Sequence, residues 1–262
     1  MGALQLQGST SGSVTLIVPS VAGSSVLTLP AVTDTLVSLA ATQTLTGKTL
    51  TSAALSAGTA TAAPLNLTSG TNLTTATAGA MEYDGTVFYA TPTASQRGVI
   101  MAEQIILLQS AYTLTSQTAA QKLFNTPTSG QVTLTTGTYE FECFYSLSSM
   151  SASSGSFGFA LGGTATLTQF FYATAQKGVA AVATATATQS TYNVAANTTL
   201  ATASVNTVGY AQISGIINVS VSGTIIPQVS LGIAAAAVVG IGSYFRIRPI
   251  GSTTVTSVGN WS

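Results

Sequence analysis

Hydrophobic and polar residues alternate with a period of two in the second half of the chain, most regularly in the segment YEFECFYSL at 139–147. Such alternation predicts a strand with one buried face. The face expected to be buried carries Tyr139, Phe141, Cys143, Tyr145 and Leu147, and the opposite face carries Glu140, Glu142 and Phe144. Cys143 is the only cysteine of the chain, so we expect a buried free thiol.

Similar patterns recur throughout residues 101–262, where Gly, Ser, Asn and Pro turns separate short apolar runs. Many short strands at this spacing predict a β-sandwich or jelly-roll head. The most apolar run, 231–241, is shorter than the ~20 residues that span a bilayer as a helix, and we expect a buried strand or strand pair there. The other expected strands cover 104–108, 131–134, 156–161, 167–173, 211–221, 228–233 and 244–250.

Residues 79–100 are expected to form a β-hairpin that serves as a collar or linker. Two short extended runs, 81–83 and 86–90, flank Asp84-Gly85. An Asp-Gly pair favours a two-residue hairpin turn, because both turn positions need a positive φ. Pro92 is expected to end the pairing of the second strand, since proline has no N–H to donate.

Residues 1–78 are rich in Thr, Ala and Ser and nearly uncharged, and they form the extended part of the expected architecture. Short apolar strands at 13–18, 25–29 and 35–39 are separated by proline and small residues. One copy would bury too little apolar surface to offset an ordering cost of ~1–2 kcal/mol per residue. Three intertwined copies would supply the missing contacts, which predicts a narrow trimeric shaft. A disordered linker is the alternative.

Charged residues make up 5% of the chain, against a typical ~25%, and the formal net charge is zero. This balance offers no basic surface for nucleic acid or for a membrane. Histidine is absent, which removes Ser-His-Asp and Cys-His arrangements and the commonest zinc ligand. We therefore expect no enzymatic activity, no cofactor, no nucleic-acid binding and no membrane insertion.

The N-terminal part resembles a known family. GSTSGSVTLIVPSVAGSSVLTLPAVTDTLVSL, followed by ATQTLTGKTLTS, is similar to the N-terminal segment of tailed-bacteriophage fibre and virion structural proteins, with Gly47 where that family commonly has asparagine. PLNLTSGTNLTTATAGAMEYDGTVFYATPTASQRGVI resembles a segment that recurs in phage structural proteins just before a terminal domain. The resemblance covers about residues 8–100 and implies that residues 1–78 form a shaft or a virion-attachment region. The closing strand SYFRIRPIGS and the size of the head are similar to trimeric jelly-roll heads of the tumour-necrosis-factor and complement-C1q type, which phage fibre tips often use.

These resemblances imply a homotrimeric tail fibre or spike, assembled in the host cytoplasm and built into the virion beside other phage proteins. Its head would adhere to a glycan or protein of the host surface, with three sites adding avidity. A capsid-attached head fibre or decoration (cement) protein is the alternative, and the sequence does not distinguish the two locations. A secreted adhesin is disfavoured, because residues 1–4 lack the basic region of a signal peptide.

A few residues are candidates for chemistry or recognition. Glu140 and Glu142 project from one face of a strand and are weak candidates for metal ligands, for a calcium ion, although a solvated or interchain face is the simpler use. Arg246 and Arg248 are expected to pair with these glutamates, within or between chains. The candidate interchain or receptor strip comprises Tyr244, Arg246, Arg248, Phe171 and Tyr172.

Overall fold

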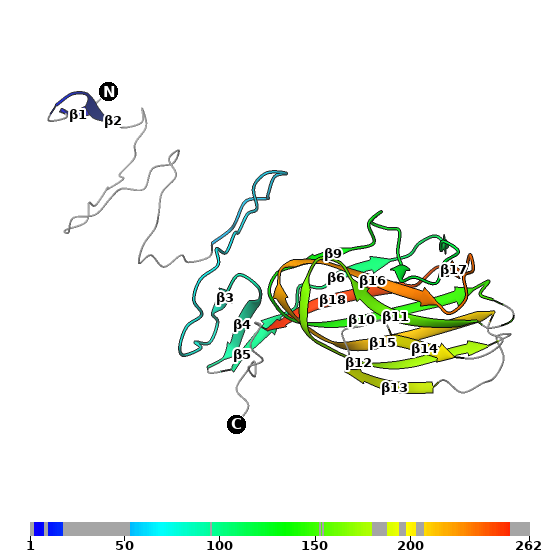
Figure 1. Ribbon diagram of the computed structural model, residues 1–262. Helices are drawn as coiled ribbons and strands as arrows, with labels where there is room; N and C mark the ends of the chain where they lie inside the picture. Colours follow the sequence, from blue (N-terminus) through cyan, green and yellow to red (C-terminus); the bar gives the residue numbers. More distant parts are fainter. Residues whose placement is uncertain are drawn as a thin grey trace. The chain divides into compact units, whose positions relative to one another are not determined.

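The computed structural model (Figure 1) describes residues 3–7, 10–17, 53–94, 96–151, 153, 155–179, 188–193, 198–202 and 207–251. Within these ranges all regular secondary structure is β-strand, arranged in antiparallel sheets, and the expected all-β fold class is confirmed. None of the described segments forms a helix that is long and apolar enough to cross a membrane. The chain divides into two compact units, Met1–Ala57 and Gly58–Ser262.

The first unit contains one described hairpin. β1 (Ala3–Gln7) pairs antiparallel with β2 (Ser13–Ile17), and the connection includes Gly12 at a φ of +78°, which glycine adopts without strain. β2 coincides with the strand expected at 13–18. The strands expected at 25–29 and 35–39 lie outside the described residues. Intertwining with other copies stays a prediction.

The collar is a three-stranded sheet rather than a single hairpin. β3 (Met81–Tyr83) pairs with β4 (Phe88–Thr93), which pairs with β5 (Gln96–Ile100). The expected two-residue turn is wrong: Tyr83 pairs with Phe88, so four residues form the loop, and only Gly85 has a positive φ. The side chain of Asp84 stabilises this longer loop by accepting hydrogen bonds from the N–H groups of Thr86 and Val87, each at 2.8 Å.

Pro92 does not end the pairing of β4, which is a second correction. β4 continues through Pro92 to Thr93, where it pairs with Gln96. The register shifts between Ala90 and Thr93, so the proline lies in a bulge. A bulge tolerates proline because the ladder is interrupted there and no N–H is required.

Residues 58–78, which the sequence pattern assigned to the shaft, belong to the same compact unit as the collar. Hydrogen bonds among Arg97, Glu82 and Leu73, here called the clasp, connect part of this segment to the sheet. Arg97 donates from Nε to Glu82 Oε2 at 2.8 Å and from Nη2 to the Leu73 carbonyl at 2.6 Å, while Leu73 N–H donates to Glu82 Oε1 at 2.5 Å. The hydrogen bond from Leu73, aided by Arg97, lowers the pKa of Glu82 against the opposing effect of burial.

The head contains an eight-stranded sheet centred on β10 (Gly137–Ser148). One edge of β10 pairs with β15 (Val208–Val221), which is followed by β12 (Thr166–Val179) and β13 (Thr188–Asn193). The other edge is shared. β18 (Tyr244–Gly251) and then β6 (Gln104–Leu107) cover one part of it, and β17 (Val238–Val239) and then β7 (Tyr112–Thr113) cover the other.

A five-stranded sheet covers the first one (Figure 1). It runs from β14 (Thr198–Thr202) through β11 (Ser156–Gly162) to β16 (Gly223–Leu231). β8 (Gln121–Lys122) and β9 (Val132–Leu134) pair with different parts of β16. The apolar run at 231–241 therefore contains the end of β16, a loop and β17, rather than one continuous strand.

The two sheets pack face to face over one aromatic core in a sandwich-like arrangement. The expected alternation on β10 is confirmed, because Tyr139, Phe141, Cys143, Tyr145 and Leu147 are all buried. Phe141 of β10 lies 6.4 Å from Phe159 of β11, measured between ring centroids, so side chains of both sheets meet in the middle. Burial of this aromatic area is the main stabilising contribution to the head.

Cys143 is confirmed as a buried free thiol with no exposed surface, and burial raises the pKa of the thiol well above its usual range. We expect the folded protein to resist modification by a disulfide reagent such as Ellman's reagent at pH 8, since the thiolate is the reacting species. The rate should rise to that of an exposed thiol in denaturant. Stoichiometric modification faster than global unfolding would contradict this burial.

Candidate functional site

The candidate site is the outer face of the eight-stranded sheet, formed by side chains that point away from the aromatic core. Successive side chains of a strand lie on opposite faces, so the pairing registers identify the members of this face. In one row, Phe171 of β12 lies beside Ile216 of β15, which lies beside Glu140 of β10, which lies beside Arg248 of β18. Two further rows comprise Ile105, Arg246, Glu142, Ser214 and Ala173, and Leu107, Tyr244, Phe144, Gln212 and Ala175.

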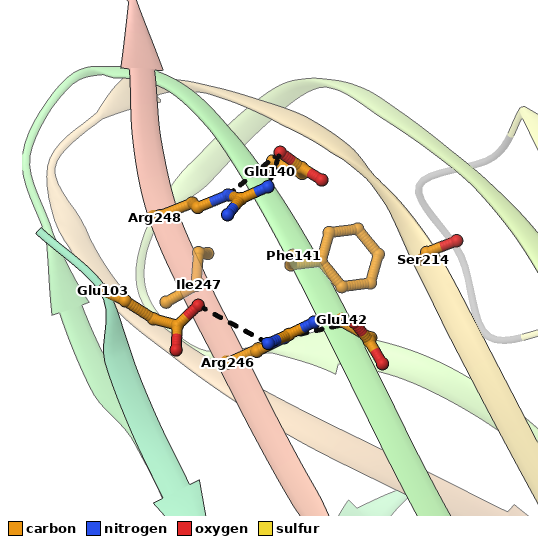
Figure 2. Close-up of a pocket in the computed structure, with 8 residues that line it drawn as sticks. All are labelled: Glu103, Glu140, Phe141, Glu142, Ser214, Arg246, Ile247 and Arg248. Atoms are coloured by element: carbon orange, nitrogen blue, oxygen red, sulfur yellow. Dashed lines mark hydrogen bonds and ion pairs between the residues drawn. The ribbon is translucent and has the colours of Figure 1, made fainter. Parts of the chain in front are cut away.

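Two Arg–Glu pairs occupy the centre of the outer face (Figure 2). Arg248 donates to Glu140 Oε2 from Nη2 at 2.7 Å and from Nε at 3.0 Å. Arg246 donates to Glu142 Oε2 from Nη2 and, at 3.1 Å, from Nε. The expected pairing of these arginines with Glu140 and Glu142 is thus confirmed within one chain. Figure 2 also shows Glu103 near Arg246, with 3.9 Å between Oε2 and Nη1.

Tyr244 extends the network around Glu142. Its hydroxyl donates to Glu142 Oε1, and its ring stacks against that of Phe144 with 6.1 Å between centroids. Burial by itself would raise the pKa of Glu142, but the hydrogen bonds from Tyr244 and Arg246 outweigh it and hold the pKa below the usual 4.5. The hydrogen bond to the carboxylate likewise raises the pKa values of Tyr244 and Arg246.

This lowered pKa makes the stability of the head depend on acidity. Because the folded-state pKa of Glu142 lies below 4.5, its contribution is complete above that pH and is lost as the pH falls through the folded value. We expect the melting temperature to drop between pH 5 and 3, and Glu142→Gln to reduce this drop. The partly exposed pair contributes up to about 1 kcal/mol. Thermal melts at each pH measure the effect, with Ser214→Ala as a control that should keep the wild-type pH dependence. An unchanged slope in Glu142→Gln would contradict the role of this carboxylate.

The arrangement favours ion pairing over calcium binding at Glu140 and Glu142. Each carboxylate already binds an arginine, and calcium requires several oxygen ligands free of competing cations. The described residues contain no cluster of three or more His, Cys, Asp or Glu that would hold a metal. The space among the side chains of the two Arg–Glu pairs is also small, about 30 Å³, which holds one or two water molecules.

The structure divides the expected strip between two faces. Tyr244, Arg246 and Arg248 lie on the outer face, as does Phe171. Tyr172 is a correction: it is 2% exposed and packs in the core, 4.8 Å from Phe170 and 5.9 Å from Phe159 between ring centroids. Neighbours along a strand point to opposite sides, so Phe171 and Tyr172 cannot share a face.

Sequence reasoning missed several apolar members of the outer face. Ile105, Leu107 and Ile216 are all more than one third exposed, and they lie at the two sides of the Arg–Glu pairs. Ile105 and Leu107 alternate with the buried Ile106 and Leu108. Because all four residues are apolar, the sequence does not show which of them point outward. The sign that was available is the presence of large hydrophobic residues at outward positions of strands otherwise rich in Ser, Thr and Gln.

Two larger hollows lie in the collar, on the surface around β3. One, about 480 Å³, lies between residues 66–73 and 80–83, and the other, about 410 Å³, is lined by residues of 79–81, 90–92 and 98–99. The only charged residue lining either hollow is Glu82, whose carboxylate is held in the clasp by Arg97 and Leu73. The carboxylate at the first hollow is therefore already bound by other groups of the chain.

Comparisons with protein-family models, with curated proteins and with solved structures found no match to this chain.

Proposed function

We propose that this chain is a structural protein of a tailed-bacteriophage virion, a homotrimeric tail fibre or spike whose head mediates adhesion to the host surface. The resemblance of residues 8–100 to phage fibre segments motivates the proposal. The head would be its distal tip, and the N-terminal region its shaft or attachment part. Other virion proteins of the tail or baseplate would be its partners.

The observation that carries this proposal is the nested pairing of the head strands. β6 pairs with β18, β8 and β9 pair with β16, β10 pairs with β15, and β11 pairs with β14. The first of these strands in the sequence pairs with the last, the next pairs with the one before the last, and so on inward. Such an order corresponds to one long two-stranded ribbon that is folded into two sheets. This order fits a jelly roll, with β12 and β13 as an added hairpin. Jelly rolls occur in viral capsid proteins and lectins, which supports a structural and adhesive role by analogy of fold.

Adhesion by such a fibre depends on multivalency rather than on a deep binding pocket. Three heads on one fibre, and several fibres on one particle, raise the effective concentration of weak sites and can increase avidity ~10²–10⁴-fold. The low charge of the chain suits this role, because contacts between uncharged surfaces change little with ionic strength.

Immunogold electron microscopy tests the proposal on particles from a bacterial culture that carries the coding sequence. Antibodies against the purified full-length chain should label the tail of each particle at a few positions. Labelling spread over the capsid would overturn the tail location and favour the head-fibre or decoration alternative. Particles that carry no label, in a preparation whose known capsid protein is labelled, would overturn the virion role altogether.

A further inference from the structure

The two outer faces of the head differ in composition. On the five-stranded sheet, the described outward positions are mostly small or polar, as in the pairs Gly158–Ser230 and Ala160–Gln228. On the outer face of the eight-stranded sheet, four large hydrophobic residues are between 39% and 59% exposed: Phe171, Ile216, Leu107 and Ile105. Hydrophobic residues gathered on one face mark an interaction surface, whereas singly scattered ones are ordinary.

These hydrophobic residues and the Arg–Glu pairs form one continuous surface. Phe171 and Ile216 are neighbours on β12 and β15, and Ile216 lies beside Glu140. On the far side of the pairs, Ile105 lies beside Arg246 on β18. Neighbouring strands are about 4.8 Å apart, so the five strands from β6 to β12 span about 19 Å. The surface is therefore wide enough for a protein partner, with apolar margins and a polar centre.

The shape of the surface disfavours a small ligand. Pockets for small molecules usually enclose about 300–1,000 Å³, whereas the space at the Arg–Glu pairs is about 30 Å³. A sugar or a nucleotide would find no enclosure there. Flat surfaces of mixed apolar and polar character are typical of contacts between proteins.

The charges of this surface are complementary to those of a copy of itself. Arg246 and Arg248 form a positive line along β18, and Glu140 and Glu142 form a negative line along β10. Both hydrogen bonds from Arg248 go to Oε2 of Glu140, and within the described residues Oε1 accepts none. A strongly acidic or basic partner would meet a like charge in one of the two lines. Around a threefold axis, each copy can instead set its arginine line toward the glutamate line of the next copy, a head-to-tail contact that closes into a ring.

We propose that the outer face of the eight-stranded sheet packs against the same face of further copies of this chain, so that Arg246, Arg248, Tyr244 and Phe171 are interchain rather than receptor residues. This inference rests on the trimer of the proposed function. Host adhesion would then use other surfaces of the head. The hydrophobic margins would supply the association energy, and the Arg–Glu lines would fix the orientation of the copies.

The test is the mass of the full-length chain in solution, by light scattering over a dilution series. Wild type should have three times the mass of one chain. Leu107→Lys combined with Phe171→Lys places a charge at each margin, and should raise the concentration at which the trimer dissociates about 100-fold or more. Ile241→Lys is the control: Ile241 is 68% exposed in a loop outside this face, and its variant should dissociate as wild type does.

Hydroxyl-radical footprinting of the wild-type chain gives a second measurement that needs no variant to fold. Phe171 and Leu107 should be protected at high protein concentration and should react once the trimer is diluted apart, while Ile241 should react equally in both conditions. If the double substitution left the concentration of trimer dissociation unchanged, or if Phe171 reacted equally at both protein concentrations, the proposed interface would be wrong. A monomeric wild type would also overturn it. Failure of the proposed function is distinguishable, because a protein absent from particles can still form this trimer.

Discussion

Replacing Phe159 with alanine is expected to lower the free energy of unfolding of the head by about 3–5 kcal/mol. Phe159 is fully buried on β11, and its ring centroid lies 5.9–6.5 Å from those of four aromatic partners: Phe141, Tyr145, Phe170 and Tyr172. All four belong to the eight-stranded sheet. The substitution therefore opens a cavity where the two sheets meet, and the surrounding rings are too large and too constrained to fill it.

Urea unfolding followed by circular dichroism measures this loss. Ile241→Ala is the matched control, because Ile241 is exposed in a loop, and its change should stay within about 0.5 kcal/mol. Phe159→Leu keeps part of the side-chain volume and should fall between wild type and Phe159→Ala, which provides a reading if the alanine variant does not fold. A loss below about 1 kcal/mol in Phe159→Ala would contradict the packing described for this core.

Alanine at Gly215 is expected to destabilise the head by about 1–3 kcal/mol, although alanine within a strand is ordinarily better than glycine by about 0.5–1 kcal/mol. A Cβ at this position would lie 2.1 Å from the carbonyl oxygen of Phe171 and 2.7 Å from the Cβ of Tyr172. The oxygen belongs to the backbone of β12, in the middle of the sheet, so relief requires two paired strands to shift. The close approach of β12 thus outweighs the intrinsic strand preference.

Gly98→Ala is the control for this prediction. Gly98 also lies in a strand, β5, but a Cβ there would meet only the Ala90 carbonyl oxygen at 3.8 Å, an ordinary contact. This variant should be neutral or more stable than wild type. Melting temperatures of both variants decide the question: equal stabilisation by the two substitutions would mean that β15 and β12 approach each other less closely than described.

The parts of the fold that follow from local pattern were predictable. The segment 139–147 alternates without interruption, so both its faces and the burial of Cys143 follow from the sequence. Arginines at 246 and 248 and glutamates at 140 and 142 share the same two-residue spacing, so the antiparallel register that places Arg248 opposite Glu140 also places Arg246 opposite Glu142. The Arg–Glu pairs were therefore expected before the strand order was known.

Two kinds of feature were not predictable: contacts between segments distant in the sequence, and the choice of which residues of a continuous apolar run point to the core. Phe170, Phe171 and Tyr172 are three aromatic residues in succession, so the pattern does not say which of them point to the core. The outer face is formed by five strands that are far apart in the sequence: β6, β18, β10, β15 and β12. No local sequence signal says that these strands are neighbours. At the collar, the Asp-Gly pair suggested a tight turn, but the hydrogen bonds from Thr86 and Val87 to Asp84 favour a longer loop.

The nested strand order has a consequence for how the head folds. Glu142 and Arg246, which face each other across β10 and β18, are 104 residues apart in the chain, and β6 also pairs with β18. Contacts between such distant segments must bear the entropy of closing long loops, which slows folding. During synthesis, β6 and the part of β10 that pairs with β18 lack this partner until residues 244–251 have left the ribosome. A prematurely terminated chain would expose those edges, which favours its aggregation and removal over its entry into an assembly.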